Sequence, residues 1–251
     1  PLGLALARAE EIIEALRATG EVTAIEVAGS ARRRRDTVGD LDILVACRDP
    51  KRVIDRFVGL PVVQTVLAHG DTKASIECRA DGRAAPLQVD LRVVAPEAYG
   101  AALQYFTGSK DHNVRLREIA QKQGLKISEY GVFSERTGKR VGGATEAQVY
   151  EAVGLPWIPP ELRENAGEIE AALGGRLPHL VAAEHIRGDL HAHTDWSDGR
   201  LPLERLVAEA EARGYEYIIV SDHSRSSTVA GGLTPEELRE QITRIRALQA
   251  K

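Results

Sequence analysis

The chain has 251 residues, of which 43% are hydrophobic and 28% are charged, so we expect folded globular units rather than disorder. The formal net charge of −4 counts against a protein coated with nucleic acid, although it is compatible with a local basic surface. No uncharged apolar run of about 18 residues is present, so no membrane partner is expected. The N-terminus also lacks the basic start and apolar core of a signal peptide.

The sulfur-containing residues predict a reducing compartment and an incomplete chain. Cys47 and Cys78 each lie in an apolar, strand-like run, which favours buried reduced thiols over a disulfide or a metal site. A cytoplasmic location fits this pattern, and we expect a monomer. The chain contains no methionine, not even at position 1, so we expect a fragment of a longer protein.

Residues 1–95 alternate predicted helices and strands, as in a mixed α/β domain. Apolar residues recur at helical spacing over 4–18, and Gly20 can end that helix. A second helix is predicted at 50–60, and Asp81-Gly82 predicts a hairpin turn. The predicted strands are 22–29, 41–47, 62–69, 73–80 and 86–94.

From Pro96 the pattern changes to a small α+β region. The predicted elements are helices at 97–106 and 111–123, a hairpin over 127–143 that turns at Thr137-Gly138, and a short helix capped by Thr145 and Gln148. A proline-rich stretch at 154–160 ends this region, and 161–187 reads as a mostly helical connector. Another α/β unit follows, with strands from Arg187 and at 216–221 and helices at 202–213 and 234–249.

Carboxylates close to a Gly-Ser pair form the first chemical motif. Asp40 and Asp42 belong to a predicted strand, where alternate residues face the same side. Two such charges repel each other unless a cation neutralises them, and Mg²⁺ prefers oxygen ligands. Asp90 lies in a further apolar strand, where a lone buried carboxylate would be costly. The sequence therefore predicts that three carboxylates converge on a site for two metal ions.

The Gly29-Ser30 pair adds an anion-binding element to this motif. Glycine lets the backbone turn tightly, and serine offers a hydroxyl and an N–H to phosphate oxygens. Arg32 and Arg33 could neutralise a triphosphate through paired hydrogen bonds. Taken singly, paired aspartates and arginine runs are more often solvated surface groups. The combination of spacing and strand context favours a functional site.

These segments resemble family X DNA polymerases of the nucleotidyltransferase superfamily. GSARRRRDTVGDLDILV at 29–45 is similar to the signature of the catalytic palm, and QVDLRVV at 88–94 to the strand of the third aspartate. YFTGS at 105–109, the helix at 111–123 and ISEY at 127–130 are similar to the nucleotide-selection segment. The resemblance covers residues ~20 to 135 in order.

The resemblance implies a DNA polymerase that adds deoxynucleotides to a primer 3′-hydroxyl, on a primer-template or gapped duplex, in DNA repair. Two Mg²⁺ or Mn²⁺ ions would be held by Asp40, Asp42 and Asp90. Contacts with the incoming nucleotide are implied for Gly29, Ser30, Arg33, Tyr105, Phe106, Gly108 and Asn113. Arg92 would lie near Asp90, and Arg117 and Tyr130 would lie near the template strand. Lys110 departs from the family pattern, because many relatives have an acidic residue there.

A second motif lies near the end of the chain. His191, His193, Asp198 and His223 occupy two predicted strand ends, and imidazole and carboxylate ligands suit Zn²⁺ or Mn²⁺. HAHTDWSDG at 191–199 and SDHS at 221–224 resemble the first two motifs of the PHP (polymerase and histidinol phosphatase) domain. The later ligand motifs of that domain have no counterpart, so we expect no competent nuclease from this chain.

The expected organisation is α/β (α+β). A nucleotidyltransferase palm would span 1–95, a small α+β thumb 96–160, a connector 161–186 and a truncated PHP unit 187–251. No helix-hairpin-helix region precedes residue 20, so truncation is expected at both ends. Two alternatives stay open: a PHP-type phosphoesterase or 3′–5′ exonuclease, and a non-catalytic nucleotide- or DNA-binding fragment. A minimal nucleotidyltransferase acting on RNA or small molecules would share Gly-Ser and Asp-x-Asp, but it is not expected to carry YFTGS followed by Asn113.

Overall fold

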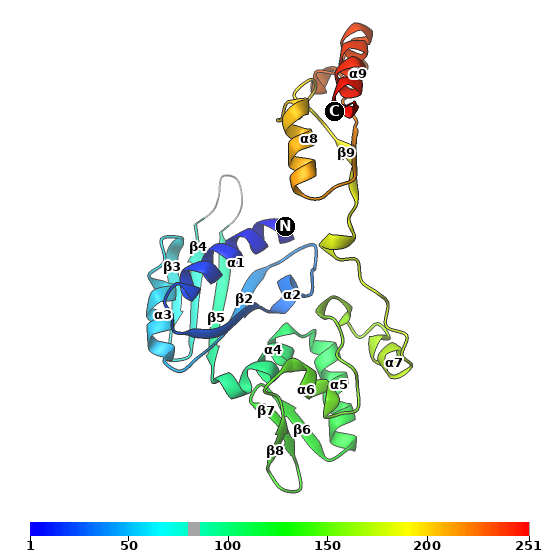
Figure 1. Ribbon diagram of the computed structural model, residues 1–251. Helices are drawn as coiled ribbons and strands as arrows, with labels where there is room; N and C mark the ends of the chain where they lie inside the picture. Colours follow the sequence, from blue (N-terminus) through cyan, green and yellow to red (C-terminus); the bar gives the residue numbers. More distant parts are fainter. Residues whose placement is uncertain (80–85, 251) are drawn as a thin grey trace. The chain divides into compact units, whose positions relative to one another are not determined.

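The computed structural model describes residues 1–79 and 86–250, and the predicted Asp81-Gly82 turn lies outside them (Figure 1). The chain forms two compact units, Pro1–Leu177 and Pro178–Lys251, which are described separately. Of the helices that the structure describes, none has the length and hydropathy needed to cross a lipid bilayer.

The first part of unit 1, which we call the sheet region (Leu2–Val94), contains a five-stranded mixed sheet of order β1-β2-β5-β4-β3. Strands β2 and β5 pair in parallel, and the other neighbours are antiparallel. The predicted strands are confirmed to within a few residues. The strands are β1 (Val22–Val27), β2 (Asp40–Cys47), β3 (Val63–His69), β4 (Lys73–Cys78) and β5 (Leu87–Val94). The helices are α1 (Leu2–Arg17), α2 (Gly29–Arg32) and α3 (Pro50–Val58).

Strand alternation gives the two faces of this sheet different roles. On β2, Leu41, Ile43 and Val45 face the main core, into which α1 and α3 bury their apolar residues. Leu44 points to the opposite face and packs against Ala102 and Leu103 of the following region. Because side chains alternate along a strand, the aspartates of β2 share the face of Leu44. Fully burying one such apolar side chain stabilises the fold by about 1.5–3 kcal/mol.

The second part of unit 1, which we call the helical region (Pro96–Leu177), combines helices with a three-stranded antiparallel sheet. The predicted helix at 97–106 begins as a 3₁₀ turn, η1 (Pro96–Ala98), and continues as α4 (Tyr99–Thr107). The other elements are α5 (Lys110–Lys122), β6 (Leu125–Ser128), β7 (Gly131–Ser134), β8 (Arg140–Gly142), α6 (Glu146–Glu151), η2 (Pro160–Leu162) and α7 (Glu168–Leu173). A second core of buried residues, centred on Leu116, Val132 and Tyr150, holds these elements together.

Two local predictions in this region needed correction. Thr145 caps α6 by accepting from the N–H of Gln148, but the Gln148 side chain accepts from Ala144 rather than from Thr145, so the capping box is only half formed. The connector is not mostly helical either. It contains α7 and short 3₁₀ turns, because glycines follow α7 directly and Pro178 lies shortly beyond.

Unit 2 contains a βαβ arrangement with a second helix. Strands β9 (Gly188–Ala192) and β10 (Tyr217–Val220) pair in parallel, with α8 (Leu203–Ala212) between them in sequence. A 3₁₀ turn, η4 (Thr228–Ala230), precedes α9 (Pro235–Gln249), and η3 (Ala183–His185) precedes β9. Thr234 and Glu237 form a complete capping box at the start of α9.

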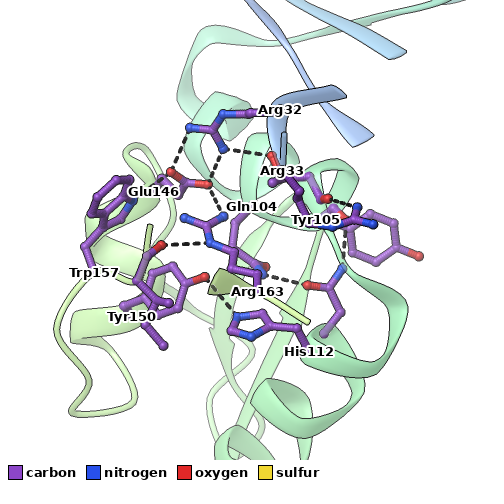
Figure 2. A network of polar contacts seen from close by, with 12 residues as sticks. Arg32, Arg33, Gln104, Tyr105, His112, Glu146, Tyr150, Trp157 and Arg163 are labelled. Atoms are coloured by element: carbon purple, nitrogen blue, oxygen red, sulfur yellow. Dashed lines mark hydrogen bonds and ion pairs between the residues drawn. The ribbon is translucent and has the colours of Figure 1, made fainter. Parts of the chain in front are cut away.

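A buried carboxylate, Glu146, joins the sheet region to the helical region (Figure 2). It accepts from Arg32 of α2 at 2.7 and 3.1 Å, from Arg163 at 2.5 Å and from the indole of Trp157 at 2.8 Å. Burial opposes its charge, yet the two guanidinium groups lower the pKa of Glu146 to about 2. Arg163 is itself fully buried, and its guanidinium lies over the Tyr150 ring at 5.1 Å.

Replacing Glu146 with Gln should destabilise unit 1, because two arginines would lose their counter-charge. Breaking a buried ion pair costs about 3–5 kcal/mol, and we expect a decrease of that order in the free energy of unfolding in urea. Glu161→Gln changes an exposed carboxylate of the same region and serves as the matched control. It should alter the free energy of unfolding by less than about 0.5 kcal/mol.

The difference in stability between the wild type and Glu146→Gln should depend on pH. The folded-state pKa of Glu146 lies below its ordinary value of 4.5, so its stabilisation is complete above pH 4.5 and is lost as the pH falls towards 2. The wild type and Glu146→Gln should therefore converge in stability across this range. A difference that stays constant would contradict the ion-pair role.

Candidate active site

Three carboxylates lie on the two parallel strands at the centre of the sheet. Asp40 and Asp42 belong to β2 and Asp90 to β5, and the strand register pairs Asp42 directly with Asp90. Paired residues of neighbouring strands project to the same face. Asp40 is exposed and the other two are half-buried, on the face that α4 covers further along at Leu44. The fold thus leaves the aspartate end of this face open.

The electrostatics at Asp42 favour a positive partner. Burial, together with the negative charges of Asp40 and Asp90, raises the pKa of Asp42 to about 6. The charges of Arg92 and Lys73 oppose this shift only in part. A divalent cation between the carboxylates would remove the repulsion and restore the ionised form.

The Gly29-Ser30 turn lies against Asp42. Gly29 begins the one-turn helix α2 with a φ of +59°, a backbone conformation that favours glycine. The preceding Ala28 donates its N–H to the Asp42 carbonyl oxygen at 2.8 Å. A side chain at position 29 would collide with the Asp42 carboxylate. Glycine is therefore required for the turn to approach the carboxylates this closely.

An open cleft of about 520 Å³ brings this turn together with the helical region. It is lined by Gly29, Ser30, Arg33, Asp40, Asp42, Tyr105, Phe106, Thr107, Gly108, Lys110, Asn113 and Arg117. All seven residues predicted to contact a nucleotide are among them, and Thr107 is an addition that the sequence did not indicate. The peptide bond between Gly108 and Ser109 in this lining is cis.

Several lining side chains are fixed by neighbours. The Asn113 amide donates to the Tyr105 carbonyl oxygen and accepts from Gln104, both at 2.7 Å, which leaves one amide N–H for a ligand. Tyr105 and Phe106 meet edge to face at 5.2 Å, and the Arg92 guanidinium lies over the Phe106 ring at 4.5 Å. Phe106 therefore both packs and lines the cleft.

The surroundings of two further residues bear on this site. Tyr130, which was predicted to lie near the template strand, is 66% exposed beside a separate groove, next to Lys126 and Phe133. Arg33 has an acidic partner that the sequence did not indicate, since its Nε donates to Glu164 at 2.8 Å. The two residues are 131 positions apart, and no local pattern could have linked them.

A second cluster of possible metal ligands lies in unit 2. Among the described residues, only His193, Asp198 and His223 form a group of three whose ligand atoms all lie within 4.8 Å of one another. His193 Nδ1 is 2.6 Å from Asp198 Oδ1, and His223 Nε2 is 3.4 Å from Asp198 Oδ2. His191, the fourth predicted ligand, lies beside the group, with its Nε2 3.0 Å from that of His193.

Asp222 organises the loop that carries this cluster, a role the sequence did not reveal. It accepts from the N–H and hydroxyl of Thr194, from Ser197 and from Gln241, at 2.6–2.8 Å. Burial opposes its charge, but these hydrogen bonds lower the pKa of Asp222 below its ordinary value. Asp222 therefore supports the loop that carries Asp198.

Comparison with known proteins adds independent information. Residues 102–164 match the family described as DNA polymerase beta thumb. The chain is 40% identical over all of its 251 residues to the DNA polymerase/3'-5' exonuclease PolX of Bacillus subtilis. The match covers 100% of this chain and 43% of the Bacillus protein. It is 29% identical over 161 residues to DNA polymerase lambda of Rattus norvegicus, covering 54% of this chain and 28% of the relative.

A viral relative is matched over most of its own length. The chain is 25% identical over 145 residues to the Repair DNA polymerase X of African swine fever virus, which is 55% of this chain and 80% of that protein. The chain thus spans less than half of the Bacillus relative but most of the viral one. These similarities show that the chain belongs to family X of the DNA polymerases.

Proposed function

We propose that unit 1 carries the nucleotidyl-transfer centre of a repair DNA polymerase, which adds deoxynucleotides to a primer 3′-hydroxyl in primed or gapped DNA. The observation that carries this proposal is the single cleft in which the carboxylates of β2, the Gly29-Ser30 turn and Arg33 meet. A site for a triphosphate needs cation-binding oxygens and anion-binding donors side by side. This cleft offers both.

The donor set fits two divalent metal ions, Mg²⁺ or Mn²⁺. Asp40 and Asp42 would hold both ions and Asp90 one of them, since carboxylate oxygens are the ligands these ions prefer. The raised pKa of Asp42 supports this assignment, because burial and the charges of Asp40 and Asp90 penalise its ionised form, which a cation would stabilise. The bound ions would lower the pKa of the attacking hydroxyl and neutralise charge on the leaving pyrophosphate.

The remaining lining residues orient the nucleotide in this proposal. Ser30 and Arg33 bind triphosphate oxygens, and Gly29 keeps the turn close to Asp42. Tyr105, Phe106 and Gly108 line the sugar. The free N–H of Asn113 faces the base, and Arg117 lies near the template strand. Tyr130, in its separate groove, would contact the template beyond the cleft.

Changing Asp90 to Ala should abolish templated addition to a one-nucleotide gap, tested with Mg²⁺ and then with Mn²⁺. Loss of a metal ligand removes several kcal/mol of transition-state stabilisation, which corresponds to a rate decrease of about 1,000-fold or more. Asp71→Ala changes an exposed aspartate of the sheet region and should leave the rate unchanged. Metal-dependent triphosphate binding without any addition by the wild type would favour the alternative of a non-catalytic nucleotide-binding fragment.

Asp42→Asn should stabilise the metal-free protein at neutral pH. The folded-state pKa of about 6 lies above the ordinary value of 3.8, so stability is highest below pH 3.8 and decreases as the pH rises to about 6. At pH 7.5 the variant should be more stable by on the order of 1 kcal/mol, and this difference should vanish below pH 4.

Thermal unfolding with and without Mg²⁺ measures this effect. Mg²⁺ should raise the Tm of the wild type and not that of Asp42→Asn, because binding to the native state stabilises it. Asp71→Asn is the matched control and should behave as the wild type. A variant less stable than the wild type at pH 7.5 would contradict the repulsion among the carboxylates.

We propose that unit 2 binds Zn²⁺ or Mn²⁺ through His193, Asp198 and His223, with His191 as a neighbouring fourth ligand. The cluster supports this assignment because its donor atoms already converge and mix imidazole with carboxylate. This site is the feature that favours the alternative of a PHP-type phosphoesterase or 3′–5′ exonuclease. Three donor groups converge here among the described residues, so we propose metal binding without nuclease activity for this chain.

Calorimetric titration with Zn²⁺ should therefore detect a site that is lost when His191 and His193 are both changed to Ala. The wild-type chain should not trim a 3′ end in the presence of Mn²⁺ or Zn²⁺, because the described cluster brings together three ligand groups with only His191 beside them. Metal-dependent trimming that disappears in the double variant would refute this prediction and establish the nuclease alternative.

We also propose a monomeric protein in a reducing, cytoplasmic compartment. Support for the compartment comes from the position of Cys47 and Cys78, which are both buried at the ends of apolar strands of the sheet region.

A further inference from the structure

The segment 158–168 follows α6, and Glu164 near its middle contacts Arg33 of the nucleotide cleft. Arg163 anchors it, because its buried guanidinium bonds to Glu146 and to the Ile158 carbonyl oxygen at 2.8 Å. The Arg163 carbonyl oxygen also accepts from Ser109 N–H at 3.0 Å, next to the cleft-lining Gly108. The segment is thus tied at Arg163 to the turn between α4 and α5.

A second anchor lies a few residues later. Glu168 is buried and contacts His112 Nδ1 at 2.6 Å, and it accepts from the backbone N–H groups of Asn165 and Ala166 at 2.9 and 2.7 Å. Burial opposes its charge, but these bonds lower the pKa of Glu168. Glu164 lies between the two anchors, so its carboxylate has a well-defined position rather than that of a free surface group.

Glu164 points at the arginine of the cleft. Its Oε1 accepts from Arg33 Nε at 2.8 Å, and Arg33 Nη1 donates to the Thr107 carbonyl oxygen at 2.7 Å. Arg33 is only 15% exposed. A Cβ at position 108 would lie 3.2 Å from Arg33 Nη1, so the guanidinium rests on the backbone of Gly108. Two contacts from two directions therefore fix the plane of this side chain.

The donor inventory shows what this geometry leaves available. A guanidinium has five N–H donors in a rigid fork. Glu164 takes the Nε donor and Thr107 takes one of the Nη donors. The three remaining donors belong to Nη1 and Nη2, the outer nitrogens of the guanidinium (here called the Nη edge), which can bind phosphate oxygens.

We propose that Glu164 is a positioning residue of the triphosphate site, which holds Arg33 so that its Nη edge faces the cleft. The inference rests on the proposed function and extends it to the segment 158–168. Glu164 contacts Arg33 most closely, since Arg35 Nε lies farther from its Oε1, at 3.9 Å, and in this proposal it acts on the triphosphate through Arg33 and not by direct contact. The negative charge of Glu164 by itself would weaken the binding of a triphosphate. The change in triphosphate affinity when Glu164 is replaced therefore shows whether its orientation of Arg33 or its charge has the larger effect.

Two substitutions separate these effects in the full chain. Glu164→Gln keeps an oxygen that accepts from Arg33 Nε and removes the charge, whereas Glu164→Ala removes both. Orientation by Glu164 predicts that the Kd for a deoxynucleoside triphosphate with Mg²⁺ rises roughly 3- to 10-fold in the Ala variant, in line with the cost of ordering one long side chain. The Gln variant should bind at least as tightly as the wild type.

The control and a kinetic readout accompany this titration. Glu161→Ala removes an exposed carboxylate from the same segment and should leave the Kd unchanged. In gap filling, Glu164→Ala should raise the KM for the nucleotide and leave kcat nearly unaltered, and Glu164→Gln should restore the KM. Tighter binding by both Glu164 variants would overturn the inference, because Glu164 would then act as a competing charge.

An NMR measurement tests the contact independently of activity. The Arg33 Nε–H signal, assigned with Arg33→Lys, should be protected from exchange in the free wild type and in Glu164→Gln, and lost in Glu164→Ala. Unchanged Kd and unchanged Arg33 signal in Glu164→Ala would refute the inference and leave the proposed function standing. A wild type that binds neither the nucleotide nor inorganic tripolyphosphate would instead sink the proposed function, and this inference with it.

Discussion

The buried charge of Glu146 is the interaction on which the first unit depends. It gathers Arg32 from the sheet region and Arg163 from the far end of the helical region around one carboxylate. A carboxylate and two guanidinium groups are costly to bury singly and stable only together. The cleft exists because this cluster, with the apolar contact of Leu44, holds α4 against the sheet while leaving the aspartates of β2 uncovered.

Arg32, the last residue of α2, and Arg33, which follows it, have different roles. Arg32 turns into the interior and joins the regions, whereas Arg33 turns to the cleft and meets Glu164. Both also contact Thr107, one through its hydroxyl and the other through its carbonyl oxygen. The anion-binding residue Arg33 therefore lies beside the contact between the sheet region and the helical region. The segment 158–168 takes part in both, through Glu164 at Arg33 and through Arg163 at Glu146.

The two units offer different sets of possible metal ligands. The carboxylates of unit 1 lie on adjacent strands and offer only oxygen, which suits hard ions that also bind phosphate. The cluster of unit 2 offers two imidazoles and one carboxylate on loops that Asp222 braces. Support by such a hydrogen-bonded neighbour is what keeps a ligand loop in place.

Strand alternation and residue chemistry are local properties, and the sequence by itself determined what depends on them: the shared face of Asp40 and Asp42, the turn at Gly29, the His191–His193 pair and most strand limits. It could not determine which strands pair, so only the tertiary structure placed Asp90 opposite Asp42. Contacts such as Arg33 with Glu164 and Arg32 with Glu146 join residues 131 and 114 positions apart. They were decided by packing, because a long-range ion pair leaves no periodic trace in the sequence around either partner.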